Sequence, residues 1–268
     1  IESQDDVTLA ITEISPDRIY YLAAFHHSSE QVKAFNPSIL KQSFLIHVSG
    51  LTNVLDAMVS TSPECRLFYA ASSRVFGSPR SSPQNENTPL NPICPYGISK
   101  TAGIHLINFY RQQGAYCCTG YLYNHESERR ADNFVSRKIT KAAIAIERGQ
   151  STELVLGKIQ AEVDWGYAPD YTEAMELILD LDQAEDFIIA SGRTRQIQDF
   201  VEIAFNYAGL PWQDYVRADP TVVRSTPESA PFVGDTSKLL ARTGWKPKTG
   251  LKEMVHIMVD AERKNYTL

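Results

Sequence analysis

The sequence predicts an α/β fold: a doubly wound parallel sheet followed by a smaller C-terminal α/β lobe. Three short runs, 18–24, 66–71 and 117–123, are largely apolar and contain aromatic residues, which is typical of buried strands. A segment with helical periodicity follows each run. Alternating strands and helices at this spacing indicate a parallel sheet with helices on both faces.

The expected helices are marked by apolar residues at intervals of three and four. In the first, Val7, Ile11 and Ile14 lie on one face, and the Ser-Pro-Asp sequence at 15–17 ends the segment. Glycines close the third and fourth helices, as is common at helix C-termini. A loop rich in Pro, Ser and Asn is expected at 78–95. The four expected helices span 5–14, 40–60, 97–113 and 134–148.

Beyond residue 150 the alternation becomes less regular. Residues 153–156 and 186–190 are expected as strands, and four helices are expected at 171–181, 196–208, 235–243 and 251–264. We therefore expect residues 1–150 to form the sheet domain and residues 151–268 to form mainly a substrate-binding lobe, with some later segments returning to the first domain.

The composition restricts the class of protein. A chain of 268 residues with 43% apolar and 22% charged residues can bury a large core. The net charge of −6 argues against nucleic acid as a partner. No apolar run approaches the ~20 residues that span a membrane. The four cysteines lack metal-ligand spacing, and the vicinal pair Cys117 and Cys118 should point to opposite faces of a strand. A cytoplasmic protein without a metal is expected.

Tyr96 and Lys100 form the first candidate reactive pair. Their i, i+4 spacing at the start of a helix places both side chains on one face. A nearby ammonium favours the phenolate and brings a tyrosine toward the range of a useful base. Ser72, at the end of a strand, could hydrogen-bond the same substrate oxygen. Such a Tyr-Lys pair also occurs by chance on surface helices. The flanking sequence motifs are therefore needed to distinguish a reactive pair from a chance one.

The neighbouring segments carry a family resemblance. ASSRVFG (71–77) and PYGISK (95–100) resemble the extended short-chain dehydrogenase/reductase family. YNHESERRADNFVSRKI (123–139) and DWGYAPDYTEAM (164–175) resemble its GDP-mannose 4,6-dehydratase branch, as do EDFIIASG and GDTSKLLARTGWKPK further on. The resemblance covers nearly the whole chain. It implies a Rossmann-like NAD(P)-binding domain and a C-terminal sugar-nucleotide lobe.

The resemblance also implies a cofactor, a substrate and the residues that hold them. The cofactor is NADP, with NAD as the alternative, and the substrate is a nucleotide sugar. Catalysis is assigned to Ser72, Tyr96 and Lys100. The residues implied at the cofactor are Leu22, Ala23, Ala24, Phe25, His26, Tyr96, Lys100, His125 and Arg130. Those implied at the substrate are Asn124, Asn133, Val135, Lys138, Arg224 and Glu228. Without the resemblance, Arg129, Arg130, Arg137 and Lys138 would equally suit a solvated basic stretch.

One part of the family pattern is absent from the sequence. The first βαβ unit of the family carries a glycine-rich turn that binds the cofactor pyrophosphate, and no Gly-x-x-Gly-x-x-Gly occurs here. The resemblance implies that about 60 residues of a longer chain precede Ile1. The alternative is a protein that has lost its cofactor fold. We favour the first, because a sheet without its central strand would expose a long apolar edge.

Two residues depart from the dehydratase pattern. The family has Thr, a spacer and Glu where this chain has Ser72, Ser73 and Arg74. Removal of water across C5 and C6 of the sugar needs an acid and a base, which a carboxylate supplies and a permanently protonated guanidinium does not. Val163 stands where the family has an arginine for the diphosphate. Redox chemistry at C4 should survive these changes, whereas dehydration should be lost or slow.

Several functions therefore remain as hypotheses. The preferred one is an NADP-dependent enzyme that transfers hydride at C4 of a nucleotide hexose, as a 4-reductase, 4-dehydrogenase or epimerase. A true dehydratase with a relocated base, a catalytically inactive nucleotide-sugar-binding paralogue and a Rossmann-like domain with an unrelated substrate are the alternatives. The family commonly pairs through two long helices, here 40–60 and 97–113, so a homodimer or homotetramer is expected.

Overall fold

A four-stranded parallel sheet forms the centre of the larger part of the molecule. The computed structural model describes residues 1–25, 37–219 and 231–265. The strands lie in the order β1 (Arg18–Tyr21), β2 (Arg66–Ser72), β3 (Cys117–Leu122) and β7 (Asp186–Ile189). All three pairings between them are parallel. The predicted fold class, an α/β protein with a parallel sheet, is confirmed.

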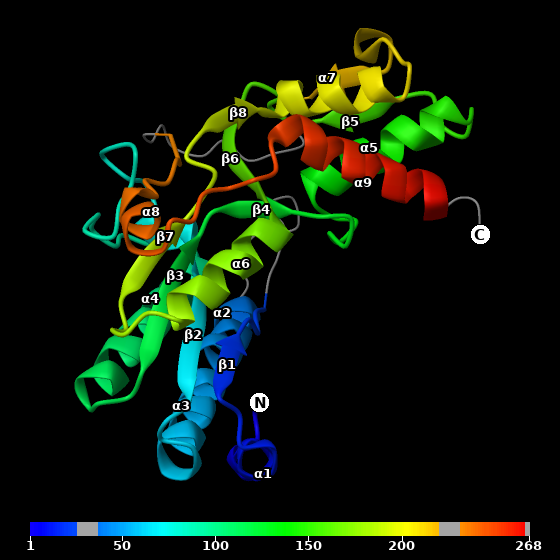
Figure 1. Cartoon of the computed structure of the whole chain (residues 1–268). Helices are drawn as coiled ribbons and strands as arrows, with labels where there is room; N and C mark the ends of the chain where they lie inside the picture. The colour runs from blue at the N-terminus through cyan, green and yellow to red at the C-terminus, as the bar shows by residue number, and fades with distance from the viewer. Residues whose placement is uncertain (26–36, 220–230, 266–268) are drawn as a thin grey trace.

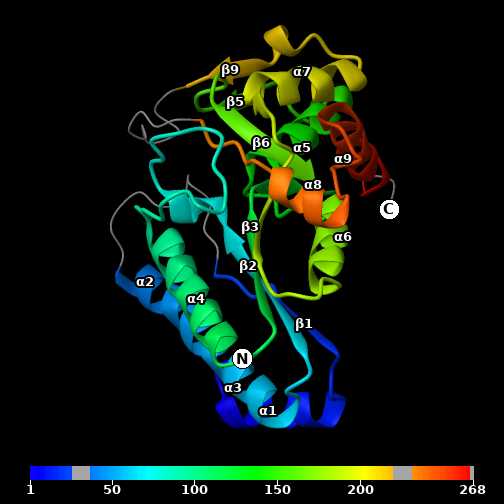
Figure 2. The ribbon, with the colours of Figure 1, turned by 60° about the vertical axis from the view of Figure 1, so that its left-hand side comes forward.

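Helices cover both faces of this sheet (Figures 1 and 2). One face is covered by α1 (Gln4–Ile14), α3 (Gly50–Thr61) and α4 (Pro95–Gln112), whose apolar residues share a buried cluster with Leu67 and Tyr69. The other face is covered by α6 (Ala168–Leu179) and α8 (Ser237–Thr243). The prediction for the vicinal cysteines is confirmed, because Cys117 lies in the first cluster and Cys118 in the second.

A second group of elements forms the smaller part at one end of the molecule (Figure 1). Its core joins α5 (Val135–Glu147), α7 (Ile197–Tyr207) and α9 (Leu251–Asn265). Short strands flank them: β4 (Asn124–Glu126), β6 (Glu162–Tyr167) and β8 (Thr194–Gln196) in one sheet, and β5 (Leu154–Leu156) with β9 (Val216–Ala218) in another. Helix α5 precedes residue 150 in sequence but packs in this core. The division of the chain into two domains at residue 150 remains a prediction. Within the described ranges, no helix is long and apolar enough to cross a membrane.

The structure corrects several predicted boundaries. The expected helix 40–60 consists of α2 (Pro37–Phe44), a π-helical turn (Leu45–Ser49) and α3. The expected strand 18–24 ends at Tyr21, because only its first four residues pair with β2. Four short strands, β4, β6, β8 and β9, were not predicted. They contain three to six residues and many polar ones, so neither apolar runs nor alternation marks them.

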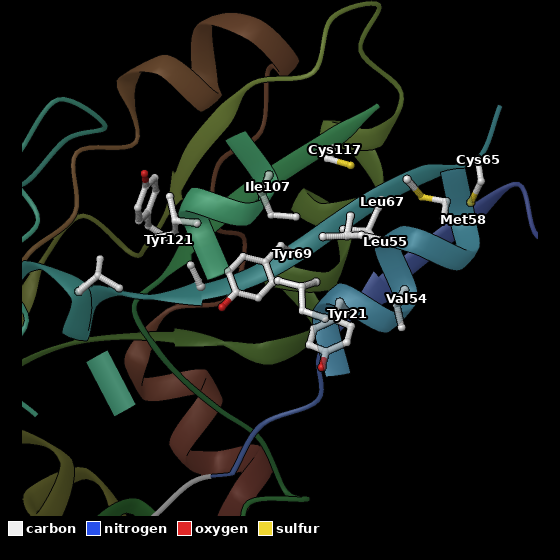
Figure 3. Packing of buried hydrophobic residues seen from close by; sticks show 14 of the residues in the cluster. Tyr21, Val54, Leu55, Met58, Cys65, Leu67, Tyr69, Ile107, Cys117 and Tyr121 are labelled. Carbon is white, nitrogen blue, oxygen red and sulfur yellow. The ribbon is translucent and has the colours of Figure 1, made fainter. Parts of the chain in front are cut away.

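The core between β2 and its helices fixes where α4 lies. Figure 3 shows Tyr69 and Tyr21 side by side in this core, with ring centroids 6.2 Å apart. A Cβ on Gly103 would lie 2.2 Å from the Tyr69 hydroxyl, so glycine alone permits this approach of α4 to the sheet. The same hydroxyl donates to the Lys100 carbonyl at 3.3 Å. The first turns of α4 are thereby held at the end of β2.

Candidate active site

The candidate site lies at the carboxyl ends of the parallel strands. Ser72 is the last residue of β2 and pairs with Leu122 at the end of β3, while Phe25 and Asn124 follow β1 and β3. In open α/β sheets ligands bind beyond the carboxyl ends of the strands, where loops of several strands meet. The fold therefore brings segments far apart in sequence to one edge.

Ser72 and Tyr96 are brought together by two tight turns. The Ser72 hydroxyl accepts from the Arg74 N–H at 3.2 Å, which shapes the turn after β2. Cys94 caps α4 through a bond from the Gly97 N–H to its sulfur at 3.4 Å. A Cβ on Gly97 would lie 2.6 Å from the Arg74 carbonyl oxygen, so this end of the helix rests directly on the turn. A side-chain hydrogen bond joins Ser72 to Tyr96.

The ionisation of Tyr96 is governed by burial and by opposing charges. Burial, followed by the charge of Cys94, raises the pKa of Tyr96 to about 12. The guanidinium groups of Arg130 and Arg74 and the Ser72 hydrogen bond pull this pKa back down. In the absence of a substrate the phenol is therefore protonated at neutral pH, and two arginines favour its anion.

Lys100 is enclosed within the protein beside Tyr96. Its side chain is 1% exposed, and Nζ donates to the Ala70 carbonyl at 2.7 Å. Nζ also lies 5.0 Å from the centroid of the Tyr69 ring and 5.8 Å from that of Tyr96. Burial lowers the pKa of Lys100 to about 7. Lysine is almost never fully buried without a partner of opposite charge, and such perturbed groups concentrate at functional sites.

Replacing Lys100 by Met should stabilise the fold while removing activity. The folded-state pKa of about 7 lies below the ordinary 10.5, so the charged lysine destabilises the native state at pH below 7. This cost, on the order of a few kcal/mol, disappears as pH rises toward the unfolded pKa. We expect the gain in melting temperature to be larger near pH ~6 than near pH ~10. Lys246→Met, at an exposed lysine, is the control; equal gains at both pH values would contradict the expectation.

His47 is a site residue that the sequence did not reveal. It lies in the π-helical turn Leu45–Ser49 and is 0% exposed. Its Nε2 accepts from the Phe25 N–H at 2.9 Å, and its Nδ1 lies 2.7 Å from the Ser99 hydroxyl. The imidazole meets the Tyr96 ring edge-on, with centroids 5.2 Å apart. Short π-helical turns often mark functional positions, but helical periodicity does not identify them.

Glu126 and Arg130 form a largely buried ion pair beside the candidate site. Glu126 is 3% exposed and accepts from the Ser136 hydroxyl at 2.7 Å, with Arg130 Nε 2.8 Å from its Oε2. Burial raises the pKa of Glu126, and Arg130 and Ser136 oppose that rise. The Arg130 guanidinium also stacks over the Phe134 ring at 3.7 Å. Arg130 is therefore a positioned cation, so the solvated basic stretch considered from sequence is the wrong interpretation for it.

The other predicted residues are distributed around this centre. Burial lowers the pKa of His125, whose Nδ1 lies 2.8 Å from the Tyr123 carbonyl oxygen. Leu22, Ala24 and Asn124 are exposed at the strand ends, and Ala23 and Phe25 are half-buried. Asn133, Val135 and Lys138 are half-buried at the start of α5, next to the Arg130–Phe134 stack. His26, Arg224 and Glu228 lie outside the described residues.

The two departures from the dehydratase pattern lie in different surroundings. Arg74 is exposed in the turn Ser73–Phe76, with its guanidinium carbon 5.9 Å from the centroid of the Phe232 ring. Val163 lies in β6 opposite Arg195 of β8 and packs partly against the core of the smaller part. Arg74 thus belongs to the candidate site, and its charge reaches Tyr96.

Comparison with known structures extends the fold assignment. The structure of RMD from Pseudomonas aeruginosa complexed with NADPH superposes with a TM-score of 0.88 at 20% identity, covering 98% of this chain and 86% of that one. UDP-glucose 4-epimerase of Thermotoga maritima with UDP-glucose gives a TM-score of 0.84 at 19% identity, covering 99% of this chain and 83% of that one. These likenesses show a common fold.

Comparison with known sequences shows the family. The chain is 38% identical to GDP-mannose 4,6 dehydratase 1 of Arabidopsis thaliana, over 93% of this chain and 68% of the relative. It is 33% identical to the human GDP-mannose 4,6 dehydratase, over 94% of this chain and 72% of the relative. A family model described as GDP-mannose 4,6 dehydratase matches residues 1–258. The chain therefore belongs to the GDP-mannose 4,6-dehydratase family, within the extended short-chain dehydrogenases/reductases.

Proposed function

We propose that this protein transfers hydride between NADP and C4 of a GDP-linked hexose. The observation that carries the proposal is the buried Lys100 beside Tyr96, with Ser72 bonded to that tyrosine at the carboxyl edge of the sheet. A lysine with so perturbed a pKa destabilises the fold, which is expected where a residue serves chemistry. The relatives named GDP-mannose 4,6 dehydratases support the choice of a GDP-hexose.

The described residues suit the nicotinamide end of the cofactor. Leu22, Ala24 and Phe25 follow β1 at the edge where ligands of such sheets bind, and Phe25 is held there by the buried His47. Lys100 supplies ammonium protons that could reach ribose hydroxyls. When bound, the oxidised cofactor accepts the hydride from C4. RMD, a protein of the same fold, was solved with NADPH.

Residues of the protein accept and return the proton of the C4 hydroxyl. With the C4 hydroxyl against Ser72 and Tyr96, the phenolate form of Tyr96 takes the O4 proton as hydride leaves C4, and the reverse step returns it. Ser72 orients the oxygen through its hydroxyl. Arg74 and Arg130 lower the pKa of Tyr96, which supports a role for both in stabilising the negative charge of the phenolate before it receives the proton.

The preferred reactions are those that keep the C6 hydroxyl. Arg74 stands where the sequence led us to expect the dehydratase carboxylate, and a guanidinium neither takes the C5 proton nor gives one to the leaving hydroxyl. A 4-reductase, 4-dehydrogenase or epimerase therefore fits better than a dehydratase with a relocated base. An inactive paralogue is the second candidate, and Arg74 with Val163 is the observation that favours it.

Isotope transfer tests the proposed function. The full chain is incubated with NADP and GDP-mannose deuterated at C4, and the cofactor is examined by mass spectrometry. We expect deuterium in the cofactor, whether or not a net product accumulates. For the reductase direction, labelled NADPH and a GDP-4-keto-hexose should give deuterium at C4. Binding of the nucleotide sugar without transfer in either direction would instead support the inactive paralogue.

We also propose that the chain forms a homodimer through α3 and α4. Apolar side chains on and beside these helices remain exposed: Leu45, Val59, Ile98 and Phe109, with exposures of 37, 44, 41 and 55%. Exposed apolar side chains on helices that contact each other suit an interface with a second copy. Phe109→Lys should shift the sedimentation of the protein toward the monomer, and Leu240→Lys, at a similarly exposed leucine of α8, should not. A monomeric wild type would overturn this proposal.

A further inference from the structure

The backbone of Arg74 is held by contacts on both sides, whereas its guanidinium forms no ion pair with any described residue. Its N–H donates to Ser72, and its carbonyl oxygen lies against the first turn of α4 beside Gly97. The guanidinium lies over Phe232 at 5.9 Å. Among the described residues, none places a carboxylate within ion-pair distance of Arg74. Arg74 is therefore an arginine at the candidate site that has no paired acid in the part of the chain that the structure describes.

The charge of Arg74 acts on Tyr96 from the turn that follows Ser72. Both Arg74 and Arg130 lower the pKa of Tyr96, so both guanidinium groups act on its hydroxyl. They differ in their partners, because Arg130 is neutralised by the buried Glu126 and Arg74 is not. Within the described ranges, the candidate site thus holds a positive charge at Arg74 that no ion pair compensates, in a chain whose net charge is −6.

The position of this charge relative to Tyr96 restricts the substrate. In the proposed function O4 of the hexose lies on Ser72 and Tyr96. The backbone of Arg74 contacts both Ser72 and the first turn of α4, so we infer that its long side chain can extend to the C6 substituent, which is two bonds from C4. A neutral C6 hydroxyl makes one hydrogen bond and leaves the charge unbalanced. A C6 carboxylate matches the planar fork of arginine and balances its charge. It also has no C6 hydroxyl to eliminate, so the missing dehydratase carboxylate is not needed.

We propose that the substrate is a nucleotide-linked hexuronate, whose C6 carboxylate is bound by Arg74. This inference rests on the proposed function for the placing of C4, and it goes further by naming the substrate class. The reacting bonds of the hydride step are unchanged: the hydride passes from C4 to the oxidised nicotinamide, and the O4 proton passes to Tyr96. The resulting 4-keto sugar is a β-keto acid. It either receives the hydride and the proton back, or loses C6 as CO2, with the electron pair of the C5–C6 bond forming an enolate that is protonated at C5. Arg74 is then a specificity-determining residue, and Ser72, Tyr96 and Lys100 remain the reactive set.

Paired ligands separate the sugar carboxylate from the rest of the substrate. GDP-mannose and GDP-mannuronate share the base and the diphosphate and differ only at C6. Calorimetry with the NADP-loaded full chain should show GDP-mannuronate binding about 10- to 100-fold more tightly, as a charge-assisted bidentate pair allows. Arg74→Gln should abolish the preference and Arg74→Lys should keep part of it. Arg80→Gln, at another exposed arginine of the same loop region, should leave it unchanged.

The outcomes distinguish this inference from the proposed function. Equal affinity for the two ligands, or a preference that survives Arg74→Gln, overturns the hexuronate assignment. If C4 deuterium still reaches the cofactor from GDP-mannose, the proposed function stands without it. A preference that depends on Arg74, with no isotope transfer from either sugar, supports the binding assignment and contradicts the proposed hydride transfer.

Discussion

Tyr96→Phe should lower hydride transfer at C4 by about 10³-fold, within the range that removal of a general acid or base produces. The substitution removes only the hydroxyl. The ring contacts with His47 and Lys100 involve the ring itself, so phenylalanine can keep them. Nucleotide-sugar affinity should therefore stay within a few-fold of the wild type, because the large loss appears only when charge develops at O4.

The measurement is single-turnover transfer of deuterium from C4 to the cofactor, with affinity determined separately by calorimetry. Tyr110→Phe is the matched control, because Tyr110 lies on the same helix and its hydroxyl is bonded to Asp56 away from the site. We expect it to transfer deuterium at the wild-type rate. A Tyr96→Phe variant as fast as the control would remove Tyr96 from the mechanism.

The sheet and its helices were predictable because their signals are local. The apolar runs that became β2 and β3 need burial on both faces, and Cys117 and Cys118 took opposite faces as strand geometry requires. Boundaries were less predictable. The π-helical turn at Leu45–Ser49 depends on what packs against it, since a buried His47 must reach both Phe25 and Ser99.

The candidate site was predictable in type and less so in its electrostatics. Spacing placed Tyr96 and Lys100 on one face, and the sequence suggested that the ammonium lowers the tyrosine pKa. In the structure the groups that lower that pKa are Arg130, Arg74 and the Ser72 hydrogen bond, while Lys100 is itself brought to a pKa of about 7 by burial. Burial and through-space charge depend on the fold, so no local pattern reports them.

The burial of Glu126 also depends on the fold and not on a local sequence pattern. The motif that contains it shows a run of charged residues, which from sequence alone suits a solvated stretch. Its carboxylate becomes buried because β4 pairs with β6 and because Arg130 and Ser136 bond to it. β4 has three residues, too few for a sequence pattern to predict.

Arg74→Glu should create 4,6-dehydration, which we expect the wild type not to catalyse. Elimination needs a group that takes the C5 proton and one that helps the C6 hydroxyl leave, and a carboxylate at position 74, two residues after Ser72, supplies this acid–base function. With GDP-mannose and NADP we expect no 4-keto-6-deoxy product from the wild type, and at least about 10² times the background from the variant, the lower range for one acid–base group.

The gain should be partial because the same change alters Tyr96. Removing Arg74 takes away one of the two cations that lower the Tyr96 pKa, and a glutamate adds a like charge, so C4 oxidation in the variant should need a higher pH than in the wild type. Arg74→Gln separates the two effects, since it loses the cation without gaining a carboxylate: it should show the alkaline shift and no dehydration.

Product from the wild type at ordinary enzyme rates would show that another residue is the base and that Arg74 does not block elimination. Product from Arg74→Glu alone would mean that the side chain at position 74 decides whether C4 oxidation continues to loss of water.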